Sequence, residues 1–160
     1  MSKHELYGLT NPELLAAMSQ LFVSFPHCKT LGFEYLGTEG RSPTLKVAWR
    51  DDLVGNPASG VVHGGIITSL VDTTSGIAVM AQLERMETIA TLDLRIDYLK
   101  AATPGKAIFC TAECYRLANQ IAFTRAVCYH DTPSDPIAHG VATFMRESSP
   151  VAMLPEGAPT

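Results

Sequence analysis

The sequence has little charge and no basic region of the kind that nucleic-acid binding requires. Charged residues make up 18% of its 160 residues, and the formal net charge is -4. A chain with this balance has no broad positive surface to attract a phosphate backbone. The first residues also lack a basic segment followed by an apolar one, which a secretory signal would need. We therefore expect a cytoplasmic protein that does not bind nucleic acid.

Metal-binding patterns are also missing. The four cysteines and five histidines include no Cys-x-x-Cys, His-x-His or His-x-x-x-His spacing, so no metal site is predicted. Cys110 and Cys114 fall in a predicted strand, where four residues span roughly 13 Å, and a disulfide bridges only about 7 Å between Cα atoms. These two cysteines are therefore not expected to pair with each other.

One long segment is almost free of charge. Between Leu53 and Leu83, Asp72 is the only charged residue. A membrane span is disfavoured, because an Asp near its middle would cost about 2.5–3.5 kcal/mol on insertion scales. We expect no membrane insertion. The pattern instead predicts a loop as far as Gly60 and then a buried central helix over about residues 63–82.

The remaining patterns predict one domain over residues 1–147. An N-terminal helix is expected at about 10–25, because Thr10 or Asn11 can cap it and Pro12 suits its first turn. Within 90–99 the alternation predicts a strand on which Leu92 and Leu94 face the core. Residues 148–160 predict a flexible C-terminal tail. Further strands are expected at 32–38, 44–50, 105–117, 120–130 and 136–146.

An apolar helix with strands before and after it predicts an α+β fold. The helix is most simply buried when one antiparallel sheet curls around it. Such a sheet has exposed edges that favour pairing with a second copy, so a homodimer is expected.

Asp72 lies on a stripe of small residues along the predicted central helix. At about 100° per residue, Thr68, Ser69 and Gly76 fall near Asp72, while large apolar residues fall on the opposite side. Small side chains leave room for a ligand to approach the carboxylate. The structural alternative is that Ser69, Ser75 or a backbone amide satisfies the buried charge.

His63-Gly64-Gly65 begins the same helix. The two glycines expose backbone N–H groups, which together with the positive end of the helix dipole can bind an anion or a developing oxyanion. His63 alone can equally be a helix cap or a packed core histidine.

Together these residues resemble a known family. The segment from Gly60 to Asp72, preceded by Asn56 and followed by Thr91 to Tyr98, resembles the hotdog-fold acyl-CoA thioesterases of the phenylacetate-pathway (PaaI-like) type. Its specific core is His-Gly-Gly with an Asp nine residues after the His. The resemblance covers about residues 33–146. It implies a hotdog fold, in which a curved antiparallel sheet wraps around a long central helix, and a homodimer or homotetramer (dimer of dimers) with active sites between protomers.

The resemblance also implies hydrolysis of an acyl-CoA substrate. Asp72 of one subunit would be the nucleophile or general base, and the backbone N–H of Gly64 on the other would polarise the thioester carbonyl. These two groups need neither a metal nor a cofactor. Supporting catalytic roles fall to His63, which would fix the loop, to Asn56, which would orient water or substrate, and to Thr91 beside the carboxylate. Substrate contacts are expected from Gly65, Thr68, Ser69 and Arg95.

Two other functions stay open at this point. A hotdog-fold acyl-thioester hydratase or dehydratase would need a His beside the acid, and none occurs between Asp51 and Gly60 or shortly after Asp72. A non-catalytic acyl-CoA-binding module would keep the fold without turnover, and measurable hydrolysis would separate the two. The Gly-x-Ser-x-Gly motif of α/β-hydrolases is absent. The acyl group, aryl or aliphatic, also stays open.

Overall fold

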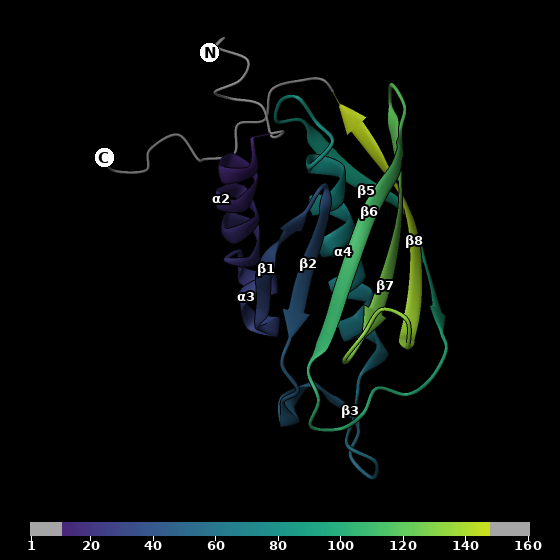
Figure 1. The fold of residues 1–160 in the computed structure, drawn as a ribbon. Coiled ribbons are helices and arrows are strands. Elements are labelled where there is room, and N and C mark those ends of the chain that lie inside the picture. The colour runs from purple at the N-terminus through teal and green to yellow at the C-terminus, as the bar shows by residue number, and fades with distance from the viewer. Residues whose placement is uncertain (1–10, 148–160) are drawn as a thin grey trace, which may run out of the picture.

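The computed structural model describes residues 11–147 (Figure 1). The flexible tail predicted for residues 148–160 lies outside the described residues. In the part of the chain that is described, no helix is long and apolar enough to cross a membrane.

Within residues 11–147, two helices precede the sheet where one was expected. The first, α2, covers Pro12–Val23, and the side chain of Asn11 caps it by accepting hydrogen bonds from the N–H groups of Glu13 and Leu14. The second, α3, covers Pro26–Leu31 and ends at Gly32, whose φ of 75° provides the left-handed C-cap. The helix expected at about 10–25 thus ends at Val23, and Pro26 starts a new helix, because proline suits a first turn.

A six-stranded antiparallel sheet forms the body of the protein, with strand order β1-β2-β6-β7-β8-β5. The first two strands, expected at 32–38 and 44–50, are confirmed and pair with each other as an antiparallel hairpin. Strand β5 follows the central helix and occupies the far edge of the sheet, so one of its sides is unpaired. The strands are β1 (Phe33–Glu39), β2 (Ser42–Val47), β5 (Thr88–Tyr98), β6 (Ile108–Leu117), β7 (Ile121–Tyr129) and β8 (Pro136–Glu147).

The segment before the central helix is more ordered than the predicted loop. A short 3₁₀ helix, η1 (Asp51–Leu53), leads into a small antiparallel ribbon of β3 (Val54–Asn56) and β4 (Val61–Val62). The N–H of His63 also donates to the carbonyl of Leu53 at 2.8 Å. These bonds fix the direction in which the chain enters the helix.

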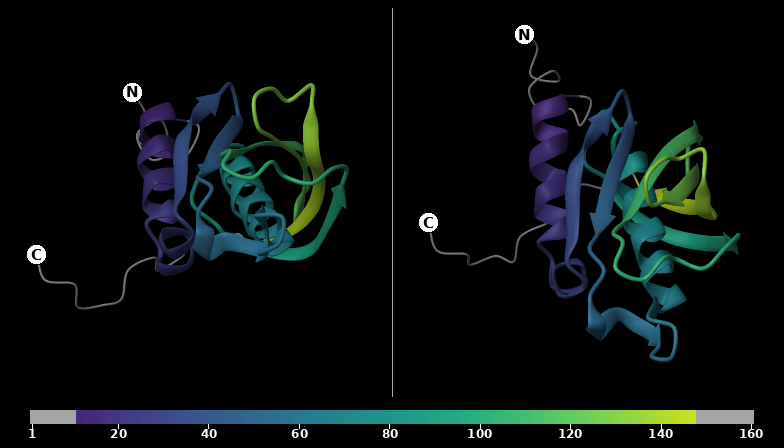
Figure 2. Two further views of the ribbon diagram at one scale, coloured as in Figure 1. Left: turned by 90° about the horizontal axis from the view of Figure 1, so that it is seen from below. Right: turned by 60° about the horizontal axis from the view of Figure 1, so that its bottom comes forward.

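The central helix, α4 (Gly64–Met80), lies in the concave side of the sheet, as Figure 2 shows from below. Leu70, Val71 and Ala78 are fully buried against the strands. Helix and sheet come so close that a Cβ on Gly140 of β8 would lie 2.5 Å from Cγ1 of Val71. The expected curved sheet around one long helix is confirmed, while α2 stands outside, beside β1 (Figure 1).

A β-bulge changes which side chains of β5 face the helix. The pairing of β5 with β8 shifts between Thr91 and Asp93, which leaves Leu92 as the extra residue. Leu92 is 54% exposed, so the expectation that it faces the core is wrong. Beyond the bulge, Leu94 and Ile96 pack against the core. Strict alternation fails here because one extra residue reverses the phase of the strand.

Candidate active site

The N-terminus of α4 is held by His63. Its Nδ1 accepts a 2.9 Å hydrogen bond from the N–H of Gly65, so a neutral ring carries its proton on Nε2. The carbonyl of His63 accepts from the N–H of Ile66 at 3.0 Å. No described residue accepts a hydrogen bond from the N–H of Gly64. This donor therefore lies at the positive end of the helix and is available to a ligand.

Tyr98, at the end of β5, holds the carbonyl group of Gly64 in place. Its hydroxyl donates to the carbonyl oxygen of Gly64 at 2.9 Å and lies 3.1 Å from the hydroxyl of Thr68. A Cβ on Gly64 would lie 3.1 Å from this tyrosine oxygen, which explains why a small residue suits the position. The sequence had suggested Thr68 as a substrate contact. Tyr98 had been counted only as part of a strand.

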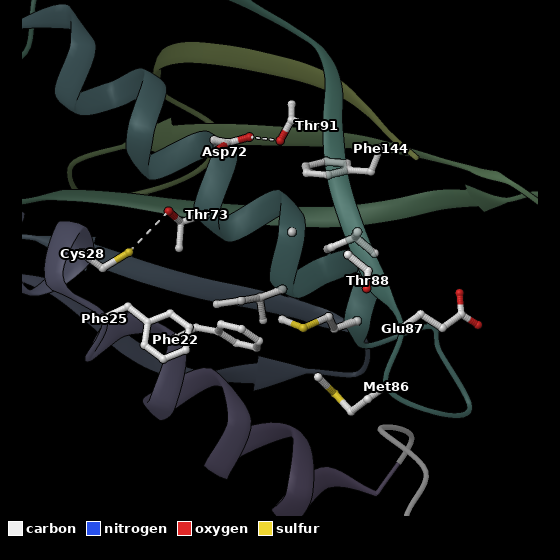
Figure 3. A pocket seen from close by; sticks show the side chains of 14 residues that line it. Phe22, Phe25, Cys28, Asp72, Thr73, Met86, Glu87, Thr88, Thr91 and Phe144 are labelled. Atoms are coloured by element: carbon white, nitrogen blue, oxygen red, sulfur yellow. Dashed lines mark hydrogen bonds between the residues drawn. The ribbon is translucent and has the colours of Figure 1, made fainter. Parts of the chain in front are cut away.

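Asp72 lies at the middle of α4. Among the described residues, one side chain forms a hydrogen bond with its carboxylate. The hydroxyl of Thr91 donates a 2.7 Å hydrogen bond to its Oδ1 (Figure 3). Ser75 does not hold the carboxylate, because its buried hydroxyl has no partner in the described part of the chain. The bulge at Leu92 is what lets Thr91 and the inward residues Leu94 and Ile96 share one face.

An apolar cavity of about 310 Å³ opens beside Asp72. Asp72, Thr73 and Thr91 line it together with large apolar side chains from three parts of the fold (Figure 3). No histidine among the described residues lines this cavity. Its apolar lining consists of Phe22 and Phe25 of α2 and its end, Cys28 of α3, Gly76, Ile77 and Met80 of α4, and Met86, Ile89 and Phe144 around the sheet.

The contribution of the N-terminal helices to this cavity was not predicted. Phe22 and Phe25 contact each other edge to face, with ring centroids 5.5 Å apart, and Cys28 Sγ lies 3.7 Å from the hydroxyl of Thr73. Their apolar spacing was visible in the sequence. It did not reveal which part of the fold the helix would cover.

Two other predicted site residues, Asn56 and Arg95, are not brought to Asp72 within this chain. Asn56 folds back on its own loop, where its side chain accepts from the N–H of Ala58 at 3.1 Å. Arg95 forms a two-pronged ion pair with Asp97, with distances of 2.9–3.1 Å, on the outer face of β5. Ser69 lies partly buried on α4, between the two ends of the site.

The site residues of one chain also lie too far apart to act on one carbonyl. Gly64 and Asp72 are eight residues apart on α4, which corresponds to about 12 Å along the helix axis. One chain thus carries two separated half-sites: an N–H donor supported by His63 and Tyr98, and a carboxylate supported by Thr91 beside a cavity. Among the described residues, no cluster of three or more His, Cys, Asp or Glu could hold a metal ion.

A curved antiparallel sheet around one central helix is the architecture of the hotdog fold. The sequence pattern of the Thioesterase superfamily matches residues 59–137. The medium/long-chain acyl-CoA thioesterase YigI of Escherichia coli is 32% identical over 151 residues, which cover 86% of this chain and 96% of that protein. The chain belongs to the thioesterase superfamily, as the His-Gly-Gly motif predicted.

Solved structures agree with this assignment. A Pseudomonas aeruginosa protein is 43% identical, with a TM-score of 0.74 over 84% of this chain and 99% of that one. The PaaI protein of the E. coli phenylacetic acid degradation operon is 17% identical, with a TM-score of 0.72 over 86% of this chain and 96% of that one. The second match shows the fold alone, and it confirms the expected hotdog architecture.

Proposed function

We propose that this enzyme hydrolyses acyl-CoA thioesters to free acid and coenzyme A, with Asp72 as the reacting carboxylate. The observation that carries the proposal is the position of Asp72, fixed by Thr91 and opening onto an apolar cavity. A cavity of this kind suits an acyl group. The name of YigI, which specifies medium- and long-chain acyl-CoA, supports the same substrate class for this chain.

The chemistry requires an attacking oxygen and a donor for the oxyanion. As a general base, Asp72 takes a proton from water while the water oxygen attacks the thioester carbon; as a nucleophile, its own oxygen attacks and water cleaves the resulting anhydride. In both routes the carbon–sulfur bond breaks, and the coenzyme A thiolate leaves and is protonated. The N–H of Gly64 stabilises the negative carbonyl oxygen.

The separation of the two groups supports an active site built from two chains. A carbonyl cannot receive the N–H of Gly64 and the attack directed by Asp72 when these lie about 12 Å apart on one helix. A second copy whose helix N-terminus approaches Asp72 would complete each site. We therefore propose a homodimer with two equivalent shared sites.

The free edge of β5 suits this dimer. Antiparallel pairing of two β5 edges around a two-fold axis at Arg95 keeps inward residues opposite inward ones. Once the extra residue Leu92 is taken into account, this register places the Thr91 end of one strand opposite the Tyr98 end of the other. Thr91 holds Asp72 and Tyr98 holds Gly64, so the pairing joins the two half-sites.

A homotetramer in the cytoplasm completes the proposal. The outer face of the sheet exposes Tyr115, Val141 and Met145, which suits packing between two dimers. All four cysteines are free and buried, as is usual in a reducing compartment.

The remaining predicted residues have supporting roles. His63 and Gly65 shape the helix start, as their hydrogen bond suggests. In the dimer, Asn56 would orient water or substrate, Thr68 and Ser69 would line the passage between the half-sites, and Arg95 would meet the phosphates of coenzyme A. The absence of a histidine from the described cavity lining counts against the hydratase alternative.

Release of coenzyme A from a panel of acyl thioesters tests the proposed function. The panel includes acetyl, hexanoyl, lauroyl, benzoyl and phenylacetyl thioesters, with the free thiol as readout. Asp72→Asn should keep the fold and lower kcat by several powers of ten. Glu39→Gln, an exposed carboxylate on β1 at the opposite edge of the sheet, is the matched control. Normal turnover by folded Asp72→Asn would leave Asp72 a structural role, and binding without hydrolysis in the native protein would indicate a non-catalytic module.

A further inference from the structure

Gly76, in the middle of α4, has no backbone reason to be glycine. It is absent from the glycines with positive φ. A Cβ at this position would meet Ile89 Cδ1 at 3.7 Å and Phe144 Cε1 at 3.9 Å, which are ordinary contacts. At Gly140, in contrast, a Cβ would clash with Val71 at 2.5 Å. Glycine also weakens a helix interior relative to alanine. What remains as the reason is the open space that the missing side chain leaves.

That space belongs to the cavity beside Asp72. Asp72, Gly76 and Met80 follow one another at steps of four residues, so they lie on one face of the helix, and all three line the cavity. Gly76 lies about 6 Å and Met80 about 12 Å from Asp72 along the axis. A group that enters at the carboxylate must pass Gly76 before it reaches Met80.

The part of the cavity farthest from Asp72 along α4 is lined by two methionines. Met80 and Met86 line it there, together with Glu87, whose buried carboxylate receives two hydrogen bonds from Arg146. With about 30 Å³ for a group the size of a water molecule or a methylene, 310 Å³ holds roughly ten such groups. Distributed along the helix from Asp72 to Met80, this volume is narrow and suits a single alkyl chain.

We propose that Gly76 determines acyl-chain length by admitting a straight chain of roughly ten carbons past the carboxylate, and that Met80 and Met86 limit its length. This inference rests on the proposed function, because it assumes that the thioester carbon lies at Asp72. It assigns specificity to three residues that do not take part in bond breaking.

The test compares kcat/KM for acetyl-, hexanoyl-, decanoyl- and palmitoyl-CoA. In the native enzyme each methylene that enters the cavity should raise kcat/KM by up to about fourfold. Gly76→Leu places a branched side chain in the passage and should lower decanoyl-CoA hydrolysis by about a hundredfold or more, with acetyl-CoA hydrolysis changed by less than about threefold. Ala17→Leu adds a leucine on the exposed side of α2 and should leave the whole profile unchanged.

Two smaller variants decide the question if Gly76→Leu does not fold. Gly76→Ala should lower decanoyl-CoA hydrolysis relative to acetyl-CoA, and Met86→Ala should raise palmitoyl-CoA relative to decanoyl-CoA. Equal losses for every chain length, or unchanged profiles in these variants, overturn the role of Gly76. A native enzyme that hydrolyses no acyl-CoA overturns the proposed function itself, which is a different outcome.

Discussion

Thr91 and Asp72 join the edge strand to the central helix through one 2.7 Å hydrogen bond, donated by the Thr91 hydroxyl to Oδ1 of the carboxylate. The bond occupies one oxygen and leaves Oδ2 for water or substrate. It also fixes the rotation of the Asp72 side chain beside the apolar cavity. The two residues are nineteen positions apart in sequence and meet only because β5 follows α4 back along its length.

Thr91→Val removes this hydrogen bond and keeps the branched shape. We expect kcat to fall about tenfold to a hundredfold, because a hydrogen bond to a charged group contributes about 1.5–3 kcal/mol. KM should change little, since Thr91 orients the carboxylate and does not hold the acyl chain. Steady-state kinetics check this, with Thr91→Ser as the variant that restores the hydroxyl. Equal rates for Val and Ser would mean that Asp72 needs no orienting partner.

Gly64→Pro removes the N–H that we assign to the oxyanion. Proline fits the first residue of a helix, so the fold should persist. Loss of one oxyanion donor costs about 2.7–4 kcal/mol, and the effect should appear in kcat more than in KM. Gly64→Ala keeps the donor, although its Cβ would lie 3.1 Å from the Tyr98 hydroxyl. Measuring Gly64→Ala with and without Tyr98→Phe separates this crowding. A proline variant as fast as the alanine variant would reject the donor role.

A shared site predicts complementation between two inactive proteins. Mixing Asp72→Asn with Gly64→Pro allows mixed dimers in which one site holds an intact Asp72 and an intact Gly64. Random exchange should restore about a quarter of the native activity, because half of the dimers are mixed and each has one working site of two. Exchange is confirmed by a size difference between tagged and untagged chains. Full exchange without activity would mean that each chain builds its own site.

Arg95→Cys should form a disulfide between two copies if the β5 edges pair around Arg95. Identical residues at a two-fold axis between antiparallel strands lie close enough for their sulfur atoms to bond. Ser134→Cys, in the exposed turn between β7 and β8, is the control. The four native cysteines are buried and should not interfere. Non-reducing electrophoresis after mild oxidation reports the result, and cross-linking only through position 134 would place the interface elsewhere.

The buried pair of Glu87 and Arg146 predicts a dependence of stability on pH. The Arg146 guanidinium lowers the pKa of Glu87 below its ordinary value of 4.5. A carboxyl whose folded pKa is lowered stabilises the protein above its unfolded pKa, and this contribution is lost as the pH falls through the folded value. Thermal unfolding should therefore show a loss of stability below about pH 4.5.

Arg146→Met removes both hydrogen bonds to the buried Glu87 carboxylate and leaves Arg85, at 4.0 Å, as its remaining ion-pair partner. We expect a loss of about 3–5 kcal/mol in the free energy of unfolding at pH 7. Lys46→Met, which breaks the more exposed pair with Glu34, should change stability by less than about 1 kcal/mol. If the two substitutions lowered the free energy of unfolding by similar amounts, the buried Glu87–Arg146 pair would contribute no more to stability than the exposed Glu34–Lys46 pair.

The sequence was sufficient for the central helix and for the positions of the six main strands along the chain. The uncharged segment around Asp72 and the glycines after His63 predicted α4 to within a few residues. A long uncharged segment of this kind indicates a buried helix, and the two glycines mark its start. The six-stranded sheet followed from regular alternation and turn residues. These features depend on local patterns, which sequence analysis reads well.

The features that sequence analysis missed depend on contacts between distant segments. The cavity wall formed by Phe22 and Phe25 requires knowing that α2 ends near α4 and β5. The Tyr98 bond to Gly64 joins residues thirty-four positions apart. The second helix, α3, was not predicted, because a proline such as Pro26 can mark the end of one helix as well as the start of the next.

The bulge at Leu92 has a consequence for how this strand tolerates changes in length. Elsewhere in β5, the gain or loss of a single residue would turn every following side chain to the opposite face. At the bulge, removal of Leu92 would leave Thr91 paired inward and Asp93 outward, so each side chain would keep its face. The fold should therefore tolerate deletion of Leu92, whereas deletion of Arg95, between Leu94 and Ile96, should prevent folding. Relatives whose strands differ by one residue at the bulge can still be aligned so that inward residues match inward ones.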